Sequence, residues 1–209
     1  MKISYVTADG MKLIKSEFDY LWGNLRPKVT EKLAWAASLG DRSENADYQY
    51  NKRYLREIDF RIQKLSDILE VTKVLDRSKE GIEENIILFG AYVEIENDNG
   101  DIRHFRIVGK NEIYNREHLI SNESPMAKGL LGKTIDDEAT VFTPNGEATW
   151  YINKISYQHE EWFGEIGEPE FKFTNREKDV NSEVKIMTDE EIAQAKKSYL
   201  ELLAKNSNK

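Results

Sequence analysis

Apolar residues in the first third of the chain recur at alternating intervals of three and four. Before a short polar break the series includes Ile14, Phe18, Leu21 and Leu25. After the break it continues as Leu55, Ile58, Ile62, Leu65 and Leu69. This spacing is typical of two helices that pack along one seam. Because the break at residues 38–43 is short, we expect an antiparallel hairpin of helices, with a kink at Pro27.

The periodicity changes beyond residue 85, where β-branched and aromatic residues become frequent. Hairpin turns are indicated at residues 97–100 and 144–146, and a short helix at residues 126–131. The strands that we expect are residues 86–96, 102–108, 139–143 and 148–152. The pattern predicts an α+β domain built on an antiparallel sheet.

These patterns divide the chain into a helical hairpin over residues 1–78, a sheet domain over 79–158 and an extension over 159–209. The extension begins acidic and irregular. Near its end Thr188 and Glu191 fit a capping box that precedes one apolar stripe, which predicts a terminal helix. For this helix we favour docking on the rest of the chain over recognition of a partner.

Composition narrows the range of functions. The 209 residues include 38 acidic and 30 basic side chains, for a net charge of −8, and no cysteine. Disulfides, thiolate metal sites and thiol nucleophiles are therefore excluded. No apolar run approaches the roughly 18 residues that span a bilayer, and the N-terminus lacks the apolar core of a signal peptide. We expect a cytoplasmic protein without a membrane partner. The three histidines, His104, His118 and His159, show no metal or catalytic spacing.

Three carboxylates lie close together at the predicted tip of the hairpin: Asp41, Glu44 and Asp47. Two interpretations fit them. Asp41 and Glu44 form a capping box for the second helix, or they are presented to a metal ion. Two carboxylates cannot enclose Mg²⁺, which takes six oxygen ligands, so the second interpretation requires a partner that supplies the others. Spacing alone favours capping.

A basic cluster follows the tip on the second helix. Its members are Lys52, Arg53, Arg56, Arg61 and Lys64. Lys52 and Arg56 share one helix face at a spacing of four residues. The cluster is either a solvated helix face or a short contact with the phosphates of a nucleic acid.

Residues 35–52 read WAASLGDRSENADYQYNK, and this run closely resembles the tip of the GreB-type bacterial transcript cleavage factors. Further matching runs are residues 55–59, 105–109, 124–127 and 146–151. The resemblance extends over about residues 1–158 and stops there. It implies an N-terminal antiparallel coiled coil and a C-terminal FKBP-like domain, in agreement with the periodicity.

The resemblance also implies a function. Such factors enter the secondary channel of RNA polymerase and stimulate the polymerase to hydrolyse the 3′ part of backtracked nascent RNA, without being enzymes themselves. Asp41 and Glu44 match the two acids that share a Mg²⁺ ion with the polymerase and position water, which reverses the capping preference. Ser43 supports this loop. We expect a monomer with no metal of its own.

Other site residues are carried over from the same resemblance. The basic cluster corresponds to the contact with the extruded RNA, although Tyr54 and Phe60 stand where further basic residues are common, which implies a weaker contact. Docking on the polymerase corresponds to Glu123, Ser124, Pro125 and Met126. One alternative is a channel-binding inhibitor that does not stimulate cleavage. Another, suggested by the FKBP-like fold alone, is a prolyl isomerase, but a fold does not carry a function.

Overall fold

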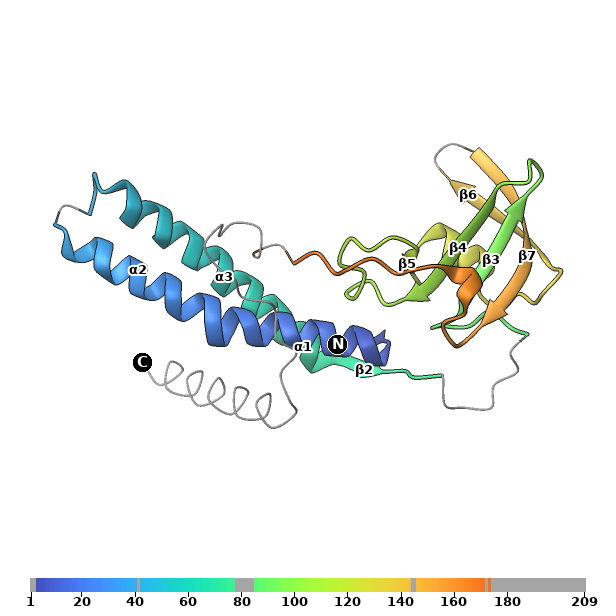
Figure 1. Cartoon of the computed structure of the whole chain (residues 1–209), viewed down its shortest axis with the longest axis horizontal. Coiled ribbons are helices and arrows are strands. Elements are labelled where there is room, and N and C mark those ends of the chain that lie inside the picture. Colours follow the sequence, from blue (N-terminus) through green and yellow to red (C-terminus); the bar gives the residue numbers. More distant parts are fainter. Residues whose placement is uncertain (1–2, 41, 78–84, 144–145, 172, 174–209) are drawn as a thin grey trace. The chain divides into compact units, whose positions relative to one another are not determined.

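The computed structural model describes residues 3–40, 42–77, 85–143, 146–171 and 173. Their contacts form two units (Figure 1). The hairpin unit contains the described residues of 12–71, and the sheet unit contains those of 1–11 and 72–178. None of the helices described is both long and apolar enough to cross a membrane.

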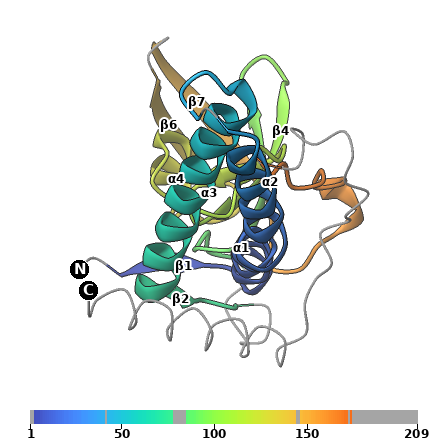
Figure 2. The ribbon, with the colours of Figure 1, turned by 90° about the vertical axis from the view of Figure 1, so that its left-hand side faces the viewer.

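Three α-helices and one π-helical turn form the helical part of the chain. They are α1 (Ala8–Tyr20), η1 (Leu21–Leu25), α2 (Arg26–Ser38) and α3 (Ala46–Val71). α2 and α3 run side by side in opposite directions (Figures 1 and 2), which confirms the predicted hairpin. The buried seam residues include Phe18, Leu21, Leu25, Val29, Tyr54, Ile58, Ile62 and Leu65.

The irregularity predicted at Pro27 takes the form of the π-helical turn directly before it. The N–H of Arg26 donates to the carbonyl oxygen of Leu21, five residues earlier. Pro27, the second residue of α2, has no N–H to donate, and its ring crowds the carbonyl four residues before it. One wider turn accommodates both effects while the helix continues.

A five-stranded sheet forms the sheet unit, in the order β5-β4-β3-β7-β6. The strands are β3 (Tyr92–Asn97), β4 (Ile102–Val108), β5 (Leu119–Ser121), β6 (Glu138–Thr143) and β7 (Gly146–Ser156). All neighbours are antiparallel except β4 and β5, which are parallel. The helix α4 (Pro125–Leu130) packs against β6. The α+β prediction is confirmed, with one parallel edge added.

The predicted strand over residues 86–96 is shorter in the structure. β3 begins only at Tyr92, and Ile86 forms an isolated bridge with Thr134. Gly90 lies between them at a φ of 92°, which interrupts an extended strand and is readily adopted only by glycine. The apolar residues before it are still buried: Ile87 is fully covered in the core of the unit.

A second, two-stranded sheet includes the start of the chain. β1 (Ser4–Val6) pairs in parallel with β2 (Thr72–Val74), the segment that directly follows α3. Strands of three residues are too short to show a periodicity, so the sequence did not predict them. Their pairing places the beginning and the end of the helical segment side by side.

Residues beyond 157 continue to pack on the sheet unit. The 3-10 turn η2 (Glu161–Phe163) buries Phe163, whose ring meets that of Tyr92 edge-on at 4.8 Å between centroids. All three histidines of the chain, His104, His118 and His159, have ring centroids within about 6 Å of the same Phe163 ring. The predicted terminal helix lies outside the described residues.

Candidate functional site

The tip of the hairpin is fixed by Asn45. Its Oδ1 accepts a hydrogen bond from the N–H of Tyr48 at 3.0 Å, and its Nδ2 donates to the carbonyl oxygen of Ala36 at 3.0 Å. The first bond makes Asn45 the N-cap of α3, and the second ties the loop to the last turn of α2. Because α3 begins only at Ala46, Glu44 precedes the cap and does not close a capping box within the helix. An asparagine directly before an apolar helical series is an ordinary capping signal that the sequence analysis passed over.

The side chains of Ser43 and Glu44 are exposed on this loop, and that of Asp47 is exposed in the first turn of α3. The loop is held on its other side by Gln49, whose Nε2 donates to the carbonyl oxygen of Arg42 at 2.9 Å. Asp41 lies outside the described residues. Glu44 is thus presented to solvent on a loop that is tied to both helices.

The tip suits only a shared metal site. Among the described residues, no group of three or more histidine or carboxylate side chains is placed to hold a metal ion. Carboxylate oxygens are the ligands that Mg²⁺ prefers, but the two acids Asp41 and Glu44 supply a minority of its six ligands. Their chemistry fits Mg²⁺ when another molecule provides the remaining oxygens.

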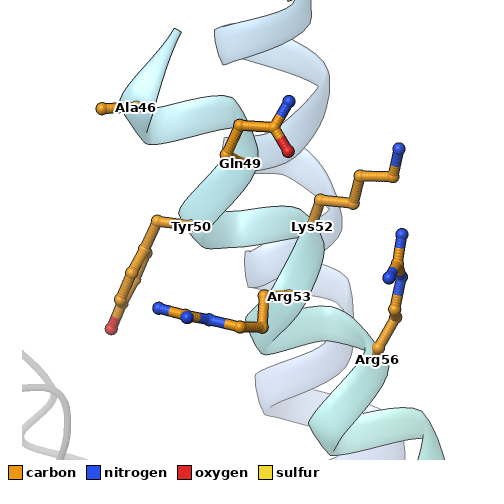
Figure 3. Close-up of a pocket in the computed structure, with 6 residues that line it drawn as sticks. All are labelled: Ala46, Gln49, Tyr50, Lys52, Arg53 and Arg56. Carbon is orange, nitrogen blue, oxygen red and sulfur yellow. The ribbon is translucent and has the colours of Figure 1, made fainter. Parts of the chain in front are cut away.

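A groove on α3 brings together three of the five residues predicted to contact RNA. Lys52, Arg53 and Arg56 line it with Ala46, Gln49 and Tyr50, and its volume is about 500 Å³. Figure 3 shows Arg53 reaching toward Tyr50, while Lys52 and Arg56 extend on the other side. None of the six lining side chains is acidic, so the groove attracts anions.

The other two members of the basic cluster lie elsewhere. Arg61 is bound by the buried carboxylate of Glu17 on α1, with bonds of 2.7 Å from Nε and 2.5 Å from Nη2. Lys64 is exposed, eight residues beyond Arg56 and on the same side of α3. Tyr54 and Phe60 also differ from one another, because Tyr54 is 4% exposed in the seam while Phe60 is 73% exposed on the surface.

The predicted docking loop leads into α4. Ser124 is the N-cap of this helix, and its Oγ accepts a hydrogen bond from the N–H of Ala127 at 3.1 Å. Glu123 and Pro125 are exposed, and Met126 packs against the core of the sheet unit. The carboxylate of Glu123 is 3.3 Å from the ammonium of Lys110. The cap fixes the backbone, which leaves Glu123 and Pro125 at the surface.

Sequence reasoning missed a buried carboxylate in the sheet unit. Glu112, 1% exposed, accepts hydrogen bonds from the N–H of Thr7, the N–H of Gly109 and the hydroxyl of Thr7. The same hydroxyl oxygen accepts a bond from the N–H of Gly10, so Thr7 caps α1. Nothing in the sequence marks Glu112, because an isolated glutamate in a loop gives no pattern.

A second buried carboxylate joins three strands of the sheet. Glu94 on β3 lies 3.1 Å from Nε2 of His104 on β4 and accepts a hydrogen bond from Nζ of Lys154 on β7 at 3.0 Å. Burial raises the pKa of Glu94, but the hydrogen bonds from Lys154 and His104 outweigh it, so the pKa lies below its usual value. His104 therefore helps to link β4 to β3.

Two family models cover most of the chain. The N-terminal domain of transcription elongation factors matches residues 4–74, and the C-terminal domain of the GreA/GreB transcription elongation factors matches residues 82–157. The chain belongs to the GreA/GreB family of transcription elongation factors. Both GreA/GreB models end by residue 157, so residues 158–209 lie beyond them.

The known proteins that are similar to this chain include two GreB factors and one solved structure. Transcription elongation factor GreB of Pseudomonas putida is 55% identical over 157 residues, which are 75% of this chain and 96% of that protein. GreB of Vibrio cholerae is 51% identical over 159 residues, 76% of this chain and 98% of that protein. A solved structure of the transcription factor Gfh1 is 25% identical and covers 74% of this chain and 97% of that one, with a TM-score of 0.36.

Proposed function

We propose that this GreB-type factor acts in the cytoplasm on bacterial RNA polymerase. Its hairpin enters the secondary channel, and its tip stimulates the polymerase to hydrolyse the 3′ part of a backtracked nascent RNA. The factor is not an enzyme by itself, because the polymerase holds the reacting RNA and most of the catalytic groups. The protein acts as a monomer.

The observation that carries this proposal is an exposed carboxylate at the end of a long hairpin of helices. α3 has 26 residues, which at 1.5 Å per residue is about 39 Å. Glu44 extends from its N-terminal end on a loop that Asn45 and Gln49 hold. Such a hairpin is suited to deliver a carboxylate into a narrow channel, because the geometry of the loop does not depend on the partner.

Asp41 and Glu44 are the residues that would hold a Mg²⁺ ion together with ligands from the polymerase. Bound there, the ion would lower the pKa of a coordinated water and offset the negative charge that develops during phosphodiester hydrolysis. The remaining tip residues position this pair. Asn45 fixes the loop against α2, and Ser43 orients it between the two acids.

The other predicted site residues bind the displaced RNA and the polymerase. The groove of Lys52, Arg53 and Arg56 holds phosphates of the displaced RNA, and Lys64 extends this contact along α3, whereas the guanidinium of Arg61 is bound by Glu17 instead. Glu123, Ser124, Pro125 and Met126 dock the sheet unit on the polymerase. Each phosphate contact adds affinity that weakens as the salt concentration rises.

RNA cleavage in stalled, backtracked elongation complexes tests the proposal. The wild type is compared with Asp41→Asn combined with Glu44→Gln, and the matched control is Asp47→Asn, which removes an acid that is exposed as Glu44 is. Binding to the polymerase is measured for each variant in parallel. We expect rapid cleavage with the wild type and the control, and loss of cleavage without loss of binding in the double variant.

Two results contradict the proposal. If the wild type binds the polymerase and does not stimulate cleavage, the protein is a channel-binding inhibitor. If the double variant cleaves as fast as the wild type, the tip acids do not take part in the reaction.

A further inference from the structure

Phe60 is a large apolar side chain in full contact with solvent. It is 73% exposed, although Ile58 and Ile62, two residues away on either side, are buried in the seam. Within the described part of the chain, no aromatic pair includes its ring. Neither core packing nor aromatic packing in the described structure therefore accounts for a phenylalanine at this position.

The neighbours of Phe60 four residues away along the helix surface are cationic, while the half-buried Glu57 lies three residues before it. Arg56 lies four residues before it and Lys64 four residues after it, so all three share the outward face of α3 with Arg53. The adjacent acid, Asp59, is bound by Arg26 of the first arm at 2.7 Å. Phe60 is thus an exposed aromatic ring between the two exposed cations Arg56 and Lys64.

This combination has a specific binding chemistry. Proteins that hold single-stranded nucleic acids pair a cationic surface, which follows the phosphates, with aromatic rings on which bases stack. A second aromatic residue, the half-exposed Tyr50, lines the groove beside Arg53. The two rings flank the arginines, about 15 Å apart along the helix.

We propose that Phe60 is a stacking platform for a base of the displaced single-stranded RNA, with Arg56 and Lys64 on the adjoining phosphates. The inference rests on the proposed function. It assigns base stacking to Phe60, in contrast to the salt-dependent phosphate contacts of the basic cluster. Where a further basic residue would add a phosphate contact, the ring adds affinity that depends little on salt.

The position of Phe60 sets the length of RNA that reaches it. It lies 14 residues after Ala46, which is about 21 Å along α3. Stacked bases rise by about 3.4 Å, so about six nucleotides cover this length. Phe60 therefore distinguishes long displaced segments from short ones.

The test compares elongation complexes backtracked by about two nucleotides with complexes backtracked by about ten. The first displaced segment is too short to reach Phe60, and the second is long enough. Phe60→Leu keeps an apolar side chain and removes the aromatic face. The matched control is Phe142→Leu, because Phe142 is 70% exposed on β6 of the sheet unit. Two quantities are measured: the factor concentration that gives half-maximal cleavage, and the fluorescence of 2-aminopurine placed in the displaced RNA, which stacking quenches.

We expect Phe60→Leu to raise the half-maximal concentration about tenfold on the long segment and to leave it unchanged on the short one. The 2-aminopurine should be quenched by the wild type and by Phe142→Leu, and less by Phe60→Leu. Phe60→Arg should restore affinity at low salt and steepen its loss as salt rises.

Two outcomes overturn the proposal. One is that Phe60→Leu has the half-maximal concentration of the wild type on both segments and quenches 2-aminopurine equally well. The other is an equal loss on both segments, since a contact with distant RNA cannot weaken the short complex. If the wild type binds without cleaving, the proposed function fails, and the quenching measurement still decides whether Phe60 stacks on RNA.

Discussion

Replacing Glu112 should release the start of α1 from the sheet unit. The Glu112 carboxylate accepts hydrogen bonds from the N–H of Thr7, the N–H of Gly109 and the hydroxyl of Thr7, and all of them are buried. Glu112→Ala removes the acceptor and leaves three buried donors without a partner. Glu112→Gln keeps one carbonyl oxygen and the shape of the side chain, and its amide group can donate to the Thr7 hydroxyl oxygen.

The magnitude follows from the number of donors. Each buried donor left without an acceptor costs about 1–3 kcal/mol, so the loss of all three in Glu112→Ala should lower the stability of this region by about 3–9 kcal/mol. Glu112→Gln should cost about 1–2 kcal/mol, because most of the bonds survive. The site has no spare room, since a Cβ added at Gly10 would overlap the Glu112 carboxylate. Gly10→Ala should therefore resemble Glu112→Ala.

Hydrogen exchange measures this effect locally, which avoids the assumption that both units unfold together. In Glu112→Ala the amides of Thr7, Gly10 and Gly109 should exchange at least about 100-fold faster, the equivalent of about 3 kcal/mol. Glu117→Ala, at an exposed glutamate of the same loop, is the control. If the three amides stay protected in Glu112→Ala, the bonds contribute little, and the reasoning from buried donors is refuted.

Two other buried acids of α1 give further predictions. Burial raises the pKa of Asp19 to about 6, although the nearby Lys15 lowers it. Its native form therefore keeps a proton that the unfolded chain releases, and unfolding free energy should fall by up to about 3 kcal/mol as pH rises from about 4 to about 6. Denaturant titrations of Asp19→Asn should lack this fall; an unchanged pH dependence would contradict the assignment. Glu17→Gln removes the charge that binds Arg61 and should cost about 1–3 kcal/mol by the same titration, whereas a cost near zero would mean that solvent already satisfies the guanidinium.

The hairpin could be predicted because its signal is repeated. Ile58, Ile62 and Leu65 mark one face of α3 over several turns, and the structure buries all three. At the start of the seam the period predicted Leu55 as the buried residue. The structure instead buries Tyr54 and leaves Leu55 half-buried. A tyrosine has enough apolar surface to enter a seam, and a period of 3.5 residues does not decide between neighbouring positions.

The contacts that hold the start of α1 could not be predicted, because each joins residues far apart in the sequence. The bonds between Thr7 and Glu112 span 105 positions. The pairing of β1 with β2 involves three residues on each side. Neither has a local periodicity or a turn signal, so only the folded chain brings the partners together. The tip lies between these two cases. Asn45 has the sequence signal of a helix cap, but the neighbouring acids Asp41 and Glu44 were considered as the cap instead.

The role of Asn45 determines how the tip acids can be tested. Because a neutral side chain caps α3, Glu44 is not needed to complete the helix, and its charge adds only about 0.3–1 kcal/mol through the helix dipole. Glu44→Gln should therefore change the unfolding free energy by less than about 1 kcal/mol. Asn45→Ala should cost about 1–2 kcal/mol, since it removes the cap and the bond to Ala36.

Denaturant titrations of both variants, followed by circular dichroism, compare these costs directly. If Glu44→Gln destabilises the hairpin as much as Asn45→Ala does, a loss of cleavage in the tip variant would reflect a distorted loop rather than a missing metal ligand. If it does not, stability and chemistry are separated at this loop. A loss of cleavage in Glu44→Gln would then be assigned to the carboxylate itself, because the side chains that shape the loop remain in place.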